Sequence, residues 1–220
     1  LGYRAASLYG RHHAERLPHR QSLRSPHARA IVKKVNKSAA EKIPGIVCIA
    51  TADDVPKSRF TIAGQTYPEP SPYDRLILDK QIRFVGDAVA LVAGTNQEAV
   101  DKALRAIRVD YEVQEPLLDF TKALDNDIVV HPEDDWKPLV DVGGDHKRNL
   151  VAKACDRHGD IDAVLASSDV VIDRTITRGR TSRRPWKRSG PMPIKMLRTL
   201  TIVSSTQVPF HVRRVVSPCS

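Results

Sequence analysis

The stretch QIRFVGDAVALVAGTNQEAVDKALRAIRVDYEV (81–113) decides the fold. The run from Ile82 to Gly94 predicts two strand pieces joined at Gly86-Asp87. A helix follows over 96–107, and alternating apolar residues over 109–113 predict another strand. The helix opens at a capping box, TNQE (95–98). Its apolar residues share one face and are Ala99, Val100, Ala103, Leu104 and Ile107.

The residues before this stretch continue the same alternation of strands and helices. AIVKKV (30–35) predicts a strand, and SAAE (38–41) resembles a capping box that opens a helix through Ile43. GIVCIA (45–50) is a nearly continuous apolar run, which predicts a strand buried on both faces with Cys48 in the core. Together with 81–113, these elements predict an α+β domain.

The residues after 113 contain fewer regular elements. Residues 117–124 form a helix-like patch, and 125–147 are a polar connection that predicts a domain boundary. A short helix is expected to open at GDIDA (159–163). DVVIDRTI (169–176) and LTIVS (200–204) predict strands. The Pro- and Tyr-rich residues 56–75 predict a long loop instead.

The positive charge is concentrated in two segments. The 220 residues contain 35 Lys and Arg against 26 Asp and Glu, which gives a net charge of +9. Residues 1–22 contribute +3 and residues 178–198 contribute +8, so the rest of the chain is slightly acidic. Both segments lack hydrophobic periodicity. The second has eight basic residues but, apart from Trp186, no interleaved aromatics, which argues against nucleic-acid binding.

Other features exclude several protein classes. No apolar run approaches the roughly 20 residues that a membrane span requires. The three cysteines form no CxxC pair and are widely spaced, which argues against a disulfide framework or a zinc site. Residues 1–22 lack the pattern of a secretory signal, so a cytoplasmic location is expected. The start at Leu1 suggests a fragment.

Three strings together resemble one protein family. They are LRSPHARA (23–30), QIRFVGDAVALVAG (81–94) with VDYE (109–112), and SSTQVPFHVRR (204–214). They are similar to the molybdenum-binding large subunit of the xanthine dehydrogenase and aldehyde oxidase family. GDIDAVLASSDVVIDRTI (159–176) is similar to the stretch that follows this family's first domain.

The resemblance implies an α/β hammerhead domain over 23–145, followed at 146–220 by the truncated start of a molybdopterin-binding domain. It also implies hydroxylation of an aldehyde or N-heterocycle with oxygen from water. Molybdenum–molybdopterin is the implied cofactor, with the cytosine dinucleotide form usual in bacterial relatives. Electrons would pass to iron–sulfur and FAD-binding partner subunits or domains.

The two basic segments depart from the family in a pattern that suggests shifted reading frames. Back-translation of PWKRSGPMPIKML (185–197) in another frame permits a Met-Glu pair followed by aromatic residues, as the family has there. SLYGRHHA (7–14) similarly permits Tyr-Thr-Asp-Asp. We therefore expect residues 1–22 to be frame-shifted or disordered and residues 178–199 to be frame-shifted and poorly ordered. Genuine divergence with a basic tail is the alternative.

Candidate site residues follow mainly from the resemblance. It places Gln207 beside the molybdenum centre as a hydrogen-bond donor to an oxo ligand, with Phe210 as a second cofactor neighbour. Arg213 and Arg214 are expected to be surface charges. Three histidines are expected in solvated loops without metal-ligand spacing: His131, His146 and His158. Ser204-Ser205 lack an accompanying His and Asp arrangement.

Two functions from different classes therefore remain. The first is a fragment of a molybdenum hydroxylase acting on a small-molecule substrate. Such a fragment is expected to be inactive alone, and to bind no cofactor or metal, because the cofactor loop and the base Glu lie further along the family's chain. The second is a non-catalytic hammerhead module that binds partner subunits.

Overall fold

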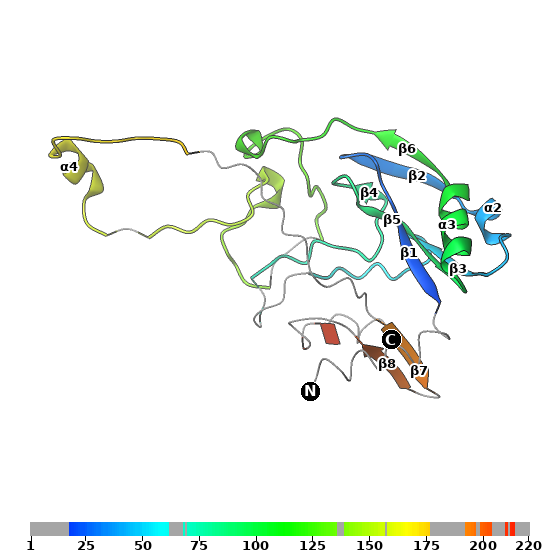
Figure 1. The fold of residues 1–220 in the computed structure, drawn as a ribbon. Coiled ribbons are helices and arrows are strands. Elements are labelled where there is room, and N and C mark those ends of the chain that lie inside the picture. Colours follow the sequence, from blue (N-terminus) through cyan, green and yellow to red (C-terminus); the bar gives the residue numbers. More distant parts are fainter. Residues whose placement is uncertain are drawn as a thin grey trace.

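Two antiparallel three-stranded sheets build the domain in the computed structural model (Figure 1). The structure describes residues 18–61, 68, 70–135, 139–156, 158–176, 192–196, 199–203, 210 and 212–213. Strands run in the order β1-β5-β3 in one sheet and β4-β2-β6 in the other. The bounds are β1 His19–Arg24, β2 Ala30–Asn36, α2 Ser38–Glu41, β3 Ile46–Thr51, β4 Gln81–Ile82, β5 Ala88–Gly94, α3 Gln97–Ala106 and β6 Arg108–Val113. The predicted α+β class is confirmed.

Helix α3 covers one face of the first sheet and forms the larger core with it. The predicted apolar face is confirmed, because Val100 and Ala103 are fully buried and Ile107 is 5% exposed. They pack with Val92 of β5 and Ile49 of β3. A smaller cluster lies under the second sheet, and Val35 and Val109 pack against both clusters. The two sheets are therefore joined by shared apolar contacts.

The predicted junction at Gly86-Asp87 exists, but it joins two sheets rather than two strands of one pair. β4 pairs with β2, whereas β5 pairs with β1 and β3. Gly86 has φ +94°, a conformation that glycine adopts without strain. Backbone hydrogen bonds of 2.8 Å from Gly86 N to Ser25 O and from Ser25 N to Asp87 O hold the turn against the chain after β1. The turn is thus fixed at the sheet junction.

Strand β1 begins at His19, four residues before the predicted domain start at residue 23. Its register with β5 pairs His19 with Gly94 and Gln21 with Val92. The expectation of disorder is therefore wrong for residues 19–22, while residues 1–17 lie outside the described part. β1 forms a strand because it pairs with β5, 60 to 75 residues further along the chain. The local sequence pattern does not predict such a distant pairing.

In both predicted capping boxes the prediction of the N-cap residue is wrong. Helix α2 has Lys37 as N-cap without a side-chain bond, and Ser38 lies inside the first turn. In α3 the cap is Asn96, whose Oδ1 accepts a hydrogen bond from Ala99 N at 2.8 Å, rather than Thr95. Asn also satisfies the free amides of a first turn, so neighbouring polar residues compete for the position.

The prediction that residues 45–50 are buried on both faces is wrong. β3 is an edge strand, and its register with β5 passes from Ile46 directly to Cys48, leaving Val47 as an extra residue. Such an irregularity interrupts the alternation of faces. Val47 is 62% exposed and the Cys48 thiol is free and exposed, so Cys48 is not a core residue.

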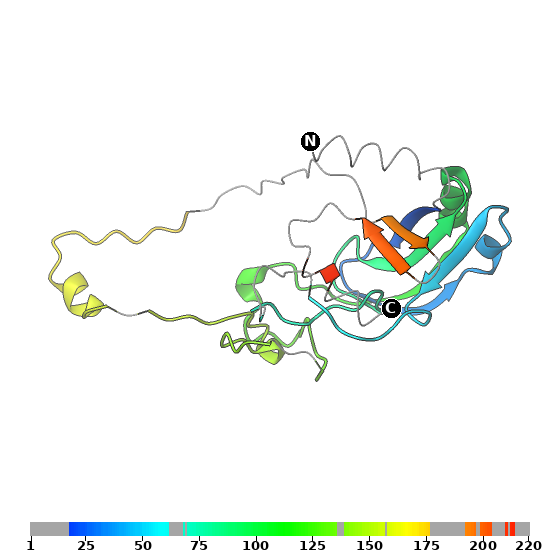
Figure 2. The same ribbon diagram turned by 90° about the horizontal axis from the view of Figure 1, so that it is seen from below.

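The residues after β6 form an irregular strap and then an arm. We call residues 116–153 the strap; it contains two single-turn helices, η2 (Phe120–Lys122) and η3 (His146–Arg148). We call residues 158–176 the arm; it contains α4 (Ile161–Ala166), capped by Asp160 as the sequence suggests. Both views show the arm extending away from the sheets (Figures 1 and 2).

The predicted strand over 169–176 is wrong in this structure, because these residues are extended but unpaired and exposed. The predicted strand over 200–204 is confirmed as β8 (Thr199–Val203), which pairs antiparallel with β7 (Met192–Met196). β7 lies inside the segment 178–199, most of which lies outside the described residues, so the expected poor order of that segment stays a prediction. Within the described part, none of the helices combines the length and apolar character that a membrane crossing requires.

Candidate functional site

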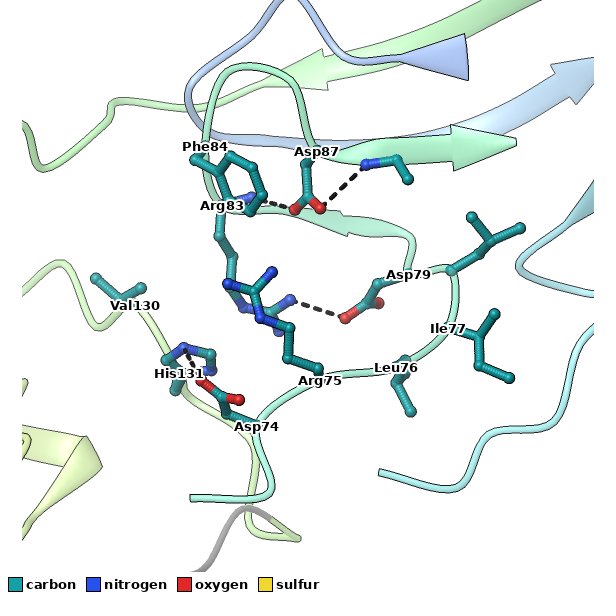
Figure 3. A pocket seen from close by; sticks show the side chains of 12 residues that line it. Asp74, Arg75, Leu76, Ile77, Asp79, Arg83, Phe84, Asp87, Val130 and His131 are labelled. Atoms are coloured by element: carbon teal, nitrogen blue, oxygen red, sulfur yellow. Dashed lines mark hydrogen bonds and ion pairs between the residues drawn. The ribbon is translucent and has the colours of Figure 1, made fainter. Parts of the chain in front are cut away.

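A charged pocket of about 230 Å³ lies where the β4–β5 turn, residues 74–79 and the strap meet (Figure 3). Its charged side chains come from segments far apart in the sequence, and the junction of the two sheets brings them together. They are Asp74, Arg75, Asp79, Arg83, Asp87 and His131.

Arg83 is the centre of this pocket. Its side chain is only 13% exposed, and its Nη1 donates to Asp79 Oδ2 at 2.8 Å and to Gln81 O at 3.2 Å. Its Nη2 pairs with the Glu133 carboxylate of the strap. A buried guanidinium needs such partners, since breaking a buried pair costs about 3–5 kcal/mol. Arg83 therefore ties the strap to the domain.

Arg59 makes a parallel attachment. Its Nε pairs with Asp135 Oδ2 at 2.8 Å, its Nη1 donates to Asp74 O at 3.2 Å, and its side chain is 11% exposed. The Asp135 pair raises the pKa of Arg59, while burial opposes this rise. The strap is thus held at two positions: Glu133 pairs with Arg83 just after β4, and Asp135 pairs with Arg59 in the loop before β4.

His131 lies between two carboxylates, and the expectation of a solvated loop histidine is wrong. Its side chain is 23% exposed, with Nδ1 3.6 Å from Glu133 Oε2 and Nε2 3.9 Å from Asp74 Oδ2. Burial lowers the pKa of His131, and the positive charge of Arg83 adds to this, while Glu133 and Asp74 oppose it. The ring is therefore held neutral at neutral pH by burial inside an ion-pair network.

The remaining pocket residues contribute hydrogen bonds and one ring contact. Asp87 Oδ2 accepts from Arg83 N at 3.3 Å, and its Oδ1 accepts from Ala88 N at 3.1 Å. The Arg75 guanidinium carbon lies 5.3 Å from the centre of the Phe84 ring, within cation–π range. Figure 3 shows the Arg75 and Arg83 side chains reaching into the same space.

This chemistry is structural rather than catalytic. Among the described residues that line the pocket, no nucleophile lies beside a base, and Arg83 is paired with Asp79 and Glu133. With His131 neutral, its three aspartates exceed its two arginines, which disfavours an anionic ligand. Among the residues that the structure describes, no three His, Cys, Asp or Glu side chains gather in a way that could hold a metal ion.

Of the two predicted cofactor neighbours the structure describes Phe210, which does not line this pocket. Gln207 lies outside the described residues, as do Arg214 and Ser204-Ser205. Phe210 is described and its ring is 75% exposed. Arg213 is exposed, as expected of a surface charge.

The other two histidines are also placed. His158 is 90% exposed, with Nε2 3.1 Å from Asp156 Oδ1, which agrees with a solvated loop. His146 is half-buried in η3, and its Nε2 is shielded from solvent, so the expectation of a solvated residue is wrong for it. Neither histidine lies in the charged pocket.

Sequence reasoning missed Arg83, Glu133 and Asn149. The i, i+4 spacing of Asp79 and Arg83 was a visible local signal of an ion pair. Glu133 is 50 residues from Arg83, and no pattern in the sequence links them. Asn149 looked like an ordinary loop residue, yet it organises the strap: its Nδ2 donates to Ala123 O and Ile128 O, both at 2.9 Å.

Comparison with known proteins identifies relatives of one kind. The model described as "Aldehyde oxidase and xanthine dehydrogenase, a/b hammerhead domain" matches residues 8–115, beginning inside the segment predicted to be frame-shifted. The "Probable hypoxanthine oxidase XdhD" of Escherichia coli (strain K12) is 34% identical over 223 aligned positions, covering 89% of this chain and 23% of the relative.

Two further matches are a curated relative and a solved structure. The "Xanthine dehydrogenase molybdenum-binding subunit" of Escherichia coli O157:H7 is 26% identical over 211 positions, covering 88% of this chain and 25% of the relative. The crystal structure of an aldehyde oxidoreductase from Desulfovibrio desulfuricans matches with a TM-score of 0.48 and 27% identity, over 56% of this chain and 14% of that chain. This chain thus spans about a quarter of the length of the curated relatives.

Proposed function

This chain carries the a/b hammerhead domain of the aldehyde oxidase and xanthine dehydrogenase family, and on that premise we propose that it is the N-terminal portion of a molybdenum hydroxylase large subunit. The enzyme would hydroxylate an aldehyde or N-heterocycle carbon with oxygen from water. The observation that supports this best is the 34% identity to a probable hypoxanthine oxidase across 89% of the chain.

The described residues have a scaffolding part in this proposal. The charged pocket does not fit a molybdopterin, because its three aspartates would face an anionic pterin phosphate and its central arginine, Arg83, is already paired with Asp79 and Glu133. We therefore assign no chemical step to it. We propose that residues 23–145 act as the hammerhead domain and that residues from 146 onward begin the cofactor-binding portion.

We retain Gln207 and Phe210 as proposed cofactor neighbours, on the similarity of SSTQVPFHVRR (204–214) to the family. When bound, the molybdopterin would supply the metal centre that oxidises the substrate. The neutral Gln207 amide is suited to donate a hydrogen bond to an oxygen that gains negative charge. The cytosine dinucleotide form of the molybdopterin belongs to the same proposal, as do iron–sulfur and flavin partners that accept the electrons.

A non-catalytic interaction module is the second candidate. The observation that favours it is the pairing of Arg59 and Arg83, which bind the strap rather than present a reactive group. In that case the domain would bind partner subunits without taking part in chemistry.

The experiment pairs this chain with the part of the Escherichia coli K12 relative that follows the matched quarter; we call that part the body fragment. Both are produced in a host that makes the molybdenum cofactor. We expect the chain alone to contain far less than one molybdenum per chain, and the co-purified pair to contain bound metal and to reduce a dye with hypoxanthine. A pair that forms without metal or activity would favour the interaction module, and stoichiometric metal on the chain alone would contradict the assignment.

A second measurement concerns the basic segments. Sequencing the gene across codons 1–22 and 178–220 tests the proposed frame shifts directly. A restored frame would supply the family's residues in both places.

A further inference from the structure

We propose that an apolar groove beside the β4–β5 turn is the surface on which the cofactor-binding body of the large subunit docks. This inference rests on the proposed function and adds the face of the domain that makes the contact. The groove, of about 280 Å³, is lined by the turn on one side and by the beginning and middle of the strap on the other.

Exposed apolar side chains form the walls of this groove. Val85 is 64% exposed, Leu118 is 73% exposed and Phe84 is 42% exposed. Beyond the groove, the strap continues the apolar surface with Phe120 at 83% exposure and Leu124 at 54%. An exposed apolar surface that extends past a groove is typical of a protein contact and exceeds what a small ligand would cover.

The groove has a rigid wall. Gly86 O accepts a hydrogen bond from Arg24 Nη1 at 2.8 Å, in addition to the two backbone bonds that Ser25 makes to the turn. Val85 is therefore presented by a turn that is held in place, which lowers the entropy that a partner would have to offset on binding. The side chain of Val85 is exposed because the hydrogen-bonded turn holds it there.

The course of the chain indicates what would occupy the groove: the polypeptide that follows the strap. Pro116, Leu117, Ile128 and Val130 line the groove, so the chain leaves the domain along it. The arm then carries more exposed apolar side chains, among them Ile172 at 79% and Ile176 at 90%. Figure 1 shows the arm extending from the strap side, opposite α2 and α3. Three quarters of the length of the curated relatives lies outside the match, which supplies a body large enough to cover both surfaces.

The alternatives on the domain are weaker. The central arginine of the charged pocket, Arg83, is already paired with Asp79 and Glu133. The outer surface of β3, with Val47 at 62% exposure, lies beside α2 at the other end of the domain and away from the arm. Because Val47 is as exposed and as apolar as Val85, it provides a matched control.

The test measures binding of the body fragment to the full chain and to two variants. In the double variant Val85→Asp with Leu118→Asp, two charges enter the groove; in Val47→Asp, one charge enters the outer surface of β3. We expect the double variant to raise the dissociation constant at least tenfold, and we expect Val47→Asp to change it less than twofold. Thermal unfolding of both variants should match the parent chain, since all three side chains are exposed.

Hydrogen exchange supplies an independent readout. On adding the body fragment, amides at 84–86 and 117–118 should gain protection, while those at 47–48 should not. Unchanged affinity of the double variant, or protection at 47–48 instead, would overturn the docking face and leave the proposed function standing. Failure of the parent chain itself to bind the body fragment would overturn the proposed function, and the docking proposal with it.

Discussion

At the scale of single residues, His131 makes the ion-pair network sensitive to pH. Burial and Arg83 lower its pKa below the ordinary 6.5, so the folded protein resists a proton that the unfolded chain accepts. The stability gained from the neutral ring is complete above pH 6.5 and is lost as the pH falls from there through the lowered pKa of the folded state. Carboxylates such as Asp54 titrate at lower pH, because the hydrogen bond from Lys37 helps to lower its pKa to about 2.

We therefore expect the thermal midpoint to fall between pH 7 and pH 5.5, and less steeply in His131→Gln, which keeps a polar but neutral side chain. Calorimetry over this pH range is the measurement. His158→Gln is the control, because that side chain is 90% exposed and should leave the pH profile unchanged. Equal slopes for the parent chain and His131→Gln would show that His131 does not carry the effect.

Asn149 is the second residue with a large predicted effect. It has φ +57°, donates two hydrogen bonds through Nδ2, and accepts one at Oδ1 from Val130 N at 2.9 Å. Asn149→Ala removes all three bonds and places a methyl group in the left-handed region, for an expected local cost of about 2–4 kcal/mol. Hydrogen exchange at the Val130 amide should accelerate at least tenfold.

Asn149→Gly separates the two causes. Glycine accepts the positive φ without strain, so only the hydrogen bonds are lost. We expect Asn149→Gly to be about 1 kcal/mol less costly than Asn149→Ala. If the two variants behaved alike, backbone strain would not contribute to the effect.

Single residues were also where sequence reasoning failed most often. Cys48 has apolar neighbours, and an apolar run is equally compatible with a central strand and an edge strand. Its exposure depends on the skipped residue Val47, which only the pairing with β5 reveals. His131 lies between Asp74 and Glu133, and a contact with a residue as distant as Asp74 leaves no local pattern.

At the scale of elements, the cap of α3 is the clearest prediction. Asn96→Ala removes the acceptor for Ala99 N and should destabilise the domain by about 1 kcal/mol, while Asn96→Asp should retain most of the stability. Thr95→Ala, at the position that the sequence favoured as cap, should cost less. Urea denaturation distinguishes the three variants, and a larger loss from Thr95→Ala would restore the original assignment.

Elements that depend on near neighbours were predicted well, and elements that depend on distant partners were not. α3 and β6 follow from periodicity within a few residues, and both formed as expected. Residues 169–176 alternate like a strand, but alternation only shows that one face prefers burial. Without a partner among the described residues they remain unpaired. β1 shows the reverse case, because its polar sequence forms a strand through pairing with β5.

At the scale of the whole molecule, the strap extends the stable unit beyond the hammerhead elements. Within the described residues, trypsin should cut first at Arg174 in the arm and at Lys153 at the end of the strap, both in exposed segments, and should leave a core that ends at Lys153. Mass spectrometry of the early fragments checks this. The variant Arg83→Leu, which unpairs Glu133, should add cuts within the strap; early cleavage inside β5 or α3 would contradict the described core.

The sheet topology sets when folding can begin on the ribosome. β1 has no partner until β5 is made, and β2 has none until β4 and β6 are made. At about 5–20 residues per second, roughly 4–14 s pass between the synthesis of β1 and that of β5. Until β4 is made near the end of that interval, the apolar residues of β2 and β3 can reach neither a sheet partner nor α3. The nascent chain is therefore most vulnerable to misassociation before residue 94 emerges, and synonymous codons that slow translation over 51–88 would lengthen that period without changing a single residue of the folded domain.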